Sequence, residues 1–194
     1  MKFFSSIPAV TICIFFSCLS SQSIASDSTP GANEFFQEFS TCETSSFEII
    51  AKNRAAYEEL GSFRSIIENG IWFDTKSTEE DLGEEIYRFE KPIKIYGLTA
   101  IAAGYSYPND VGHGFSDNGS TYWGLYFSET PKEVFDGLYG NNTMVAGMRL
   151  MGNHYVNLKI NKLEDYKFFE QVAIIEPDST IEGVNSYFNC SLQY

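Results

Sequence analysis

Residues 94–140 decide the fold, and they read KIYGLTAIAAGYSY, PNDVGHGFSDNGST, YWGLYFSE and TPKEVFDGLYG. The residues from Ile93 to Tyr107 are β-branched, aromatic or small, which predicts one long strand whose glycines permit bends. The run from Tyr122 to Phe127 has no polar face, so it predicts a central strand covered on both sides. A Gly-rich loop of 14 residues, Pro108 to Thr121, separates these two strands.

The segment after the second strand predicts the start of a helix. Thr130 is a favourable N-cap residue, Pro131 occupies a position where its missing amide hydrogen is not needed, and Glu133 completes a capping box. Gly140 supplies the C-terminal stop. The apolar residues between these two ends would pack on the sheet.

A second helix is predicted nearer the N-terminus. Ser45 and Glu48 have the spacing of a capping box, apolar residues follow at helical spacing, and Gly61 provides a stop. Directly after this helix, residues 63–73 form two short apolar runs, and the Asn69-Gly70 pair between them predicts a tight hairpin turn.

Several further strands are predicted from alternation and apolar runs. A short strand over 86–89 would end at Lys91-Pro92, because proline cannot donate to a central ladder. Within 154–160, Val156, Leu158 and Ile160 alternate with polar and aromatic residues, so we expect these three to face the core. The other predicted strands cover residues 144–151, 168–175 and 184–194.

These elements predict an α+β fold. We expect a single domain over residues 42–194, with a mainly antiparallel β-sheet and two or more helices packed on it. Residues 26–41 are polar and turn-rich apart from three phenylalanines. They predict a loose N-terminal arm whose aromatic end docks on the domain.

The first 25 residues have the features of an export signal. Lys2 precedes an apolar run that ends in small residues at Ala25, which predicts cleavage there and an exported, periplasmic or secreted protein. The run is shorter than the roughly 20 residues that cross a bilayer, so we expect no membrane span. Lipid attachment at Cys18 is the alternative.

The charge of the chain bears on its partners. Removal of residues 1–25 takes away one of 13 basic side chains and none of the 26 acidic ones, which leaves a net charge near −14. We do not expect such a chain to bind nucleic acid, because phosphate backbones are bound by clustered Lys and Arg. A basic partner protein suits the acidic surface, although the charge could serve solubility alone.

Two cysteines, Cys42 and Cys190, remain after the signal, one near each end of the chain. In an oxidising compartment they predict one disulfide. The bond would close a loop of about 150 residues and stabilise the fold by up to roughly 5 kcal/mol in the chain-entropy model. The chain contains no Cys-x-x-Cys pair, so these two cysteines do not indicate a metal site.

Known catalytic and cofactor motifs are incomplete. Ser106, Asp136 and His154 occur in the order of an α/β-hydrolase triad, but no helix is predicted after the serine. Gly114 and Gly119 have the spacing of a phosphate loop, yet a serine follows where that loop needs lysine. The sequence predicts no cofactor.

The acidic segment Thr78 to Glu85 carries five carboxylates, and calcium binding would be its functional interpretation. The segment lacks the ligand spacing of an EF-hand, so we interpret it as a solvated loop and predict no metal site.

The long loop is the candidate partner-binding site. Fourteen residues exceed what a hairpin needs, and glycines allow close approach of the backbone to a partner. The candidate contact residues are Asp110, His113, Phe115, Asp117 and Asn118. They predict a protein-binding protein that neutralises its partner, as immunity and inhibitor proteins do.

Two alternatives stay open. A small exported hydrolase could use His113 or His154 with nearby carboxylates. An envelope or surface module could carry glycans, because Asn118, Asn141 and Asn189 each begin an N-x-[ST] tripeptide.

Overall fold

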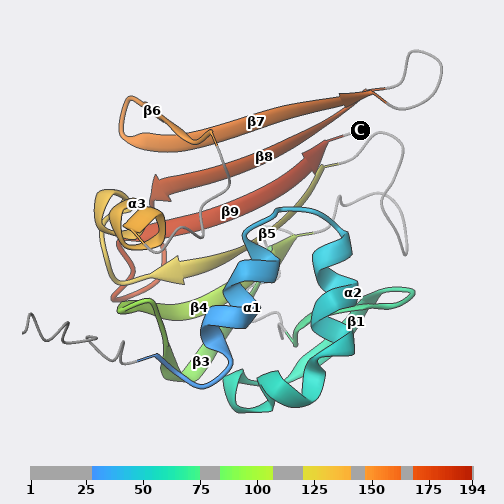
Figure 1. Ribbon diagram of the computed structural model, residues 1–194. Helices are drawn as coiled ribbons and strands as arrows, with labels where there is room; N and C mark the ends of the chain where they lie inside the picture. The colour runs from blue at the N-terminus through green and yellow to red at the C-terminus, as the bar shows by residue number, and fades with distance from the viewer. Residues whose placement is uncertain (1–27, 75–83, 107–119, 141–146, 163–167, 194) are drawn as a thin grey trace, which may run out of the picture.

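The computed structural model describes residues 28–74, 84–106, 120–140, 147–162 and 168–193. In these ranges the chain forms a seven-stranded antiparallel sheet in the order β3-β4-β5-β9-β8-β7-β6, with helices packed against it (Figure 1). The strands are β3 (Glu84–Ile95), β4 (Leu98–Ser106), β5 (Ser120–Phe127), β6 (Arg149–Met151), β7 (His154–Lys162), β8 (Phe168–Pro177) and β9 (Ser186–Gln193). The predicted α+β class, with a mainly antiparallel sheet and at least two helices, is confirmed.

The strand order follows from two meanders. β3, β4 and β5 pair in sequence, and β6 to β9 do the same. Helix α3 (Pro131–Gly140) carries the chain from β5 towards the far edge of the sheet, and the second meander then returns to the centre. There β9 pairs with β5 over eight residues without a register shift, from Ser120↔Gln193 to Phe127↔Ser186. β5 and β9 are therefore the central strands.

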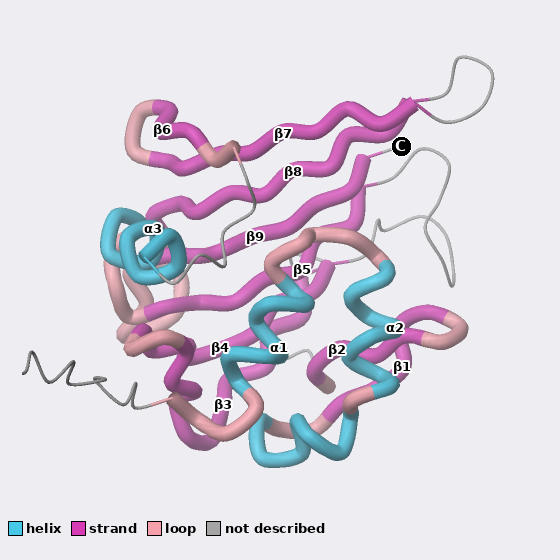
Figure 2. The backbone as a smooth tube through the Cα atoms, viewed as in Figure 1, coloured by secondary structure: helices cyan, strands magenta, loops and turns pink. Residues whose placement is uncertain are grey.

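The helices share one face of the sheet (Figure 2). α1 (Ala32–Phe39), α2 (Ser45–Lys52), the 3-10 helix η1 (Arg54–Leu60) and the hairpin of β1 (Phe63–Ile67) and β2 (Gly70–Phe73) bury aromatic rings against β3, β4, β5 and β9. Trp72 of β2 is fully buried, and its Nε1 donates a hydrogen bond to the carbonyl of Gly104 at 3.2 Å. Phe47 of α2 packs on Trp123 with a ring-centroid separation of 5.1 Å.

The predicted disulfide is confirmed. Cys42 and Cys190 are bonded, their Cα atoms are 5.2 Å apart, and both residues are buried. Gln171 on β8 also holds the chain around Cys42, because its Nε2 donates to the carbonyls of Thr41 and Cys42 at 2.9 and 2.8 Å. The segment between α1 and α2 is thus fixed to the sheet covalently and by hydrogen bonds.

The N-terminal segment is more ordered than the expected loose arm. Residues Ala32–Phe39 form helix α1, and Phe35, Phe36 and Phe39 are at most 1% exposed. With Ala32 they repeat at helical spacing, so a single face of the helix is buried. The aromatic docking that we expected is present, and the backbone that carries it is helical.

The long strand predicted over 93–107 is wrong, because the chain turns at Tyr96-Gly97. Both turn residues have positive φ, 48° and 80°, as the two-residue hairpin turn of type I′ requires. The preceding strand also does not stop at Pro92. β3 runs through it with a register shift between Arg88 and Ile93, and as an edge strand it tolerates a residue without an amide hydrogen.

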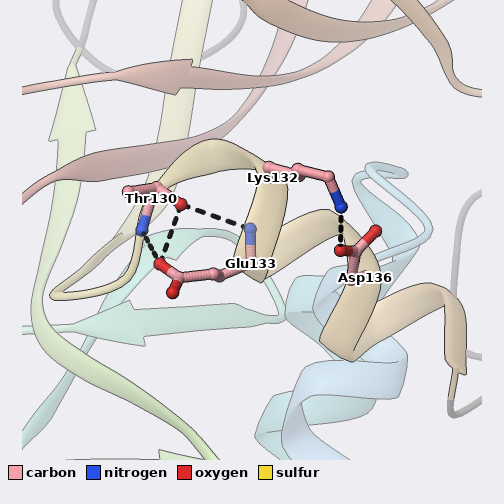
Figure 3. Close-up of polar contacts among 4 residues, drawn as sticks. All are labelled: Thr130, Lys132, Glu133 and Asp136. Carbon is pink, nitrogen blue, oxygen red and sulfur yellow. Dashed lines mark hydrogen bonds and ion pairs between the residues drawn. The ribbon is translucent and has the colours of Figure 1, made fainter.

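The two predicted capping boxes have different outcomes. At α3 the box is formed as expected: the backbone N–H of Thr130 donates to Glu133 Oε2 at 2.9 Å, and the N–H of Glu133 contacts Thr130 Oγ1 at 3.4 Å (Figure 3). At α2 the N-cap is Thr44 without a side-chain bond, and Ser45 Oγ contacts Glu43 instead. The predicted single helix up to Gly61 is divided at Asn53 into α2 and η1.

The alternation predicted for β7 is correct, but the assignment of its faces is reversed. Leu158 and Ile160 are 52% and 63% exposed, whereas Asn157 is 8% exposed. The covered side of β7 is the one that carries Tyr155, whose ring stacks on Phe135 of α3 at 4.2 Å. The predicted strand over 144–151 is limited to β6, residues Arg149–Met151, in the described part of the chain.

Candidate functional site

A hollow of about 260 Å³ lies on the sheet face opposite the helices. Four strands contribute to it: β4, β5, β9 and the end of β8 with the residue that follows. The lining residues are Ser106, Tyr122, Tyr126, Glu176, Asp178, Tyr187 and Asn189. We call this site the tyrosine hollow.

The alternation of β5 and β9 explains which residues reach the hollow. Trp123 and Leu125 of β5 belong to the core under the helices, so Tyr122 and Tyr126 point to the other face. In β9, Phe188 and Cys190 likewise face the helices, and their neighbours face the hollow. In the register Tyr126 is opposite Tyr187, and Gly124 is opposite Asn189.

The tyrosine rings form a rigid wall. Tyr126 and Tyr187 are stacked with a centroid separation of 4.1 Å and an interplanar angle of 11°. This position of Tyr187 depends on Gly124, since a Cβ on Gly124 would lie 2.3 Å from Tyr187 Cε2 and 2.5 Å from the carbonyl oxygen of Phe188. Glycine is required there for close approach, not for an unusual backbone angle.

The polar groups of the hollow include acceptor oxygens on Glu176, Asp178 and Asn189, beside the hydroxyls of Ser106 and of the three tyrosines. Asp178 Oδ1 accepts bonds from the backbone N–H and the hydroxyl of Thr180 at 2.8 and 2.7 Å, which fixes the orientation of this carboxylate. Asn189 Oδ1 is buried, and it has no hydrogen-bond partner in the described ranges. Glu176 adds a second carboxylate, and none of the lining residues is cationic.

One histidine stands at the border of the hollow. His154 Nε2 is 3.8 Å from Glu176 Oε2, and both side chains are partly exposed. Ser106 cannot act with this histidine, because β4 and β7 are four strand spacings apart in the sheet, about 19 Å. Asp136 is on α3, where it pairs with Lys132, so the structure does not assemble the Ser106, Asp136 and His154 triad.

The five candidate loop residues, Asp110, His113, Phe115, Asp117 and Asn118, lie outside the described residues. The expected loop bounds change at one end, because Thr121 is a buried residue of β5 paired with Leu192. The strand ends that flank the loop are described. Ser106 pairs with Tyr122, and both line the tyrosine hollow, so the loop leaves and rejoins the sheet beside it.

Most of the acidic segment Thr78 to Glu85 also lies outside the described residues. Its last two residues begin β3, and Glu85 forms an ion pair with Arg64 of β1. Among the described residues no cluster of three or more His, Cys, Asp and Glu could hold a metal ion. Within the same ranges, no helix has both the length and the apolar composition needed to cross a membrane.

One of the three glycosylation tripeptides is described, and it is a poor acceptor. Asn189 lies in β9 between β5 and β8, next to the disulfide-bonded Cys190, and its Oδ1 is buried. Modification would require the strand to leave the sheet. Asn118 and Asn141 lie outside the described ranges.

Comparison of the chain with family models, curated proteins and solved structures gives no match. The functional argument therefore depends on the geometry of the site. The run from Tyr122 to Phe127 is the predicted central strand, and Trp123 and Tyr126 on its two faces are at most 1% exposed. Sequence reasoning nevertheless missed the tyrosine hollow, which lies beside Tyr122 at the start of this run. A signal for the hollow was present in the sequence. Along β5 and β9, the residues of one face are tyrosine, glycine and asparagine, whereas the other face carries large apolar residues.

Proposed function

We propose that this chain is an exported protein that binds and neutralises a partner protein, in the manner of immunity and inhibitor proteins. The tyrosine hollow and the loop Pro108 to Thr121 form the contact surface. The observation that carries the proposal is a preformed, tyrosine-lined and acid-lined hollow on the sheet face that the described helices leave open.

The composition of the hollow supports protein recognition. Tyrosine is enriched at the energetically dominant positions of interfaces, because it offers a large contact area with few rotatable bonds. Here the rings stand on β5 and β9, the central strands, so little ordering accompanies binding. The disulfide adds to this rigidity, since Cys190 is the residue after Asn189 on β9.

The charge of the chain supports a basic partner. The net charge near −14 without residues 1–25 attracts a cationic surface over long distances. In the hollow, Glu176 and Asp178 continue this negative character. Cell-wall hydrolases and toxic effector proteins with basic surfaces are the classes of partner that this charge suits.

Capture experiments test the proposal. The tagged protein is incubated with purified basic cell-wall hydrolases and effectors from the same source, and the variants are Tyr122→Ala and deletion of residues 110–119. Both variants should lose most of the captured partner. Leu158→Ala is the matched control, because Leu158 is exposed in the sheet outside the hollow and its loss should leave capture unchanged. Unchanged capture by both variants would contradict the proposed surface.

A second function, hydrolysis, is favoured by one specific observation. His154 and Glu176 form a potential acid-base pair 3.8 Å apart, and Glu176 lines the hollow. The wild-type protein is screened on peptidoglycan and ester substrates, with His154→Ala and Glu176→Gln as variants. Activity that both variants abolish would establish this function, and an inactive wild-type protein would end it.

A further inference from the structure

We infer that the tyrosine hollow receives the guanidinium group of an arginine side chain that projects from the partner. This inference rests on the proposed function, because it names the group that the partner presents at this face. Guanidinium combines five hydrogen-bond donors, a permanent positive charge and a flat surface that stacks on aromatic rings. The hollow offers a complement to each of these properties.

The acceptors of the hollow come from separate elements and converge on one space. Asp178 follows β8 and is held by Thr180, which uses Oδ1 and leaves Oδ2 without a hydrogen-bond partner in the described ranges. Asn189 on β9 presents a buried Oδ1 that lacks a described donor. A buried acceptor without a donor is unfavourable, because it has lost its hydrogen bonds to water and gained none. A ligand that brings several N–H groups removes that penalty.

The rings provide the surface on which a planar cation stacks. Tyr126 and Tyr187 already cover each other. Tyr122 is half-buried, lines the same hollow, and makes no ring contact with another described residue. A guanidinium group over the Tyr122 ring gains a cation–π contact while its edge reaches the carboxylates.

The size and charge of the hollow exclude other occupants. A volume of about 260 Å³ is below the usual range for drug-sized ligands and suits one side chain. A carboxylate would be repelled by Glu176 and Asp178, and an apolar group would leave Asn189 Oδ1 unsatisfied. Lysine brings the charge but neither the flat stacking surface nor the forked donors.

Small probes test the hollow without knowledge of the partner. The ¹⁵N-labelled full chain is titrated with N-acetyl-arginine amide, and backbone amide shifts are followed by NMR. We expect saturable shifts centred on residues 122–126 and 187–191. N-acetyl-lysine amide should bind about fivefold or more weakly. N-acetyl-citrulline amide, which has the shape of arginine without its charge, should give no saturable shifts.

Variants tie the probe to the hollow. Asp178→Asn and Tyr122→Leu should each weaken arginine-probe binding about fivefold or more. Glu170→Gln should leave it unchanged, because Glu170 is exposed on the same strand face as Glu176 but outside the lining. Each variant's amide spectrum reports whether it is folded. Thr180→Val offers a milder change, since it removes only the hydroxyl that orients Asp178.

The outcomes separate this inference from the proposed function. Equal binding of the arginine and citrulline probes, or a loss with Glu170→Gln as large as with Asp178→Asn, would overturn the arginine site. If partner capture then still depends on Tyr122, the proposed function stands with a different anchor. If the arginine probe binds as expected while no tested partner is captured, the site stands and the proposed class of partner falls.

Discussion

At the scale of single residues, Gly124 determines the shape of the tyrosine hollow. The Gly124→Ala substitution would place a Cβ 2.3 Å from Tyr187 Cε2 and 2.5 Å from the Phe188 carbonyl oxygen. The ring can move, but the backbone oxygen belongs to the central strand β9. We expect the free energy of unfolding to fall by about 1–3 kcal/mol, as overpacking of a tight site usually does.

Urea unfolding of the wild type and of Gly124→Ala measures this loss. A second substitution, Tyr187→Ala in the Gly124→Ala background, removes the ring contact and leaves the contact with Phe188 O. We therefore expect the glycine substitution to be less destabilising in the Tyr187→Ala background than in the wild type, though still measurable. Equal losses in both backgrounds would show that the ring plays no part.

At the scale of elements, the capping box of α3 is formed and that of α2 is not, although both were predicted from the same sequence spacing. Thr130→Ala removes the side chain that pairs with Glu133 and should destabilise the protein by about 1 kcal/mol. Ser45→Ala is the matched control, because Ser45 is exposed and does not cap its helix. It should change stability by less than about 0.5 kcal/mol.

The pH dependence of this effect follows from the same bonds. Hydrogen bonds from the backbone N–H and the side chain of Thr130 hold the pKa of Glu133 below its usual value of 4.5. The folded state thus favours the carboxylate, so the contribution is present above pH 4.5 and is lost as the pH falls through the folded pKa. The difference between wild type and Glu133→Gln should shrink below pH 4.5. A difference that grows on acidification would contradict the assignment.

β7 shows what a strand's periodicity determines and what it leaves open. Alternation places Val156, Leu158 and Ile160 on one face, but only the position of α3 and Tyr155 decides which face is covered. Ile160→Thr should therefore leave the free energy of unfolding within about 0.5 kcal/mol, because the side chain is 63% exposed.

The substitution to compare with Ile160→Thr is Ile175→Thr on the neighbouring strand β8. Ile175 pairs with Tyr155 and is fully buried, so this change should be destabilising by about 2 kcal/mol or more. Thermal or urea unfolding of the two variants gives the comparison. If Ile160→Thr proved as damaging as Ile175→Thr, the face opposite the helices would have to be covered.

At the scale of the whole molecule, the features that could be predicted from the sequence are those that local sequence patterns determine. Apolar runs, turns and caps were sufficient for the fold class, for α3 and for the β1–β2 hairpin, and the two cysteines for the disulfide. The hairpin turn itself lies at Glu68-Asn69 and not at the predicted Asn69-Gly70, because Gly70 already pairs with Ile67 as the first residue of β2. The tyrosine hollow was not accessible in this way, because it requires β9 to pair with β5 rather than with a neighbour in sequence. Tyr122 and Asn189 meet only through that distant pairing, which no local propensity encodes.

The net charge of the molecule and the contacts in the hollow should affect different rate constants of partner binding. The net charge near −14 acts over long range and raises the association rate, and salt screens it over about 10 Å at 0.1 M. We expect the association rate constant for the captured partner to fall by about tenfold or more between 20 and 500 mM NaCl. Contacts inside the hollow act mainly on dissociation, so Tyr122→Ala should raise the dissociation rate and keep the same salt slope. Surface plasmon resonance at several salt concentrations measures both rates. An association rate that does not respond to salt would mean that the acidic surface serves solubility and not recognition.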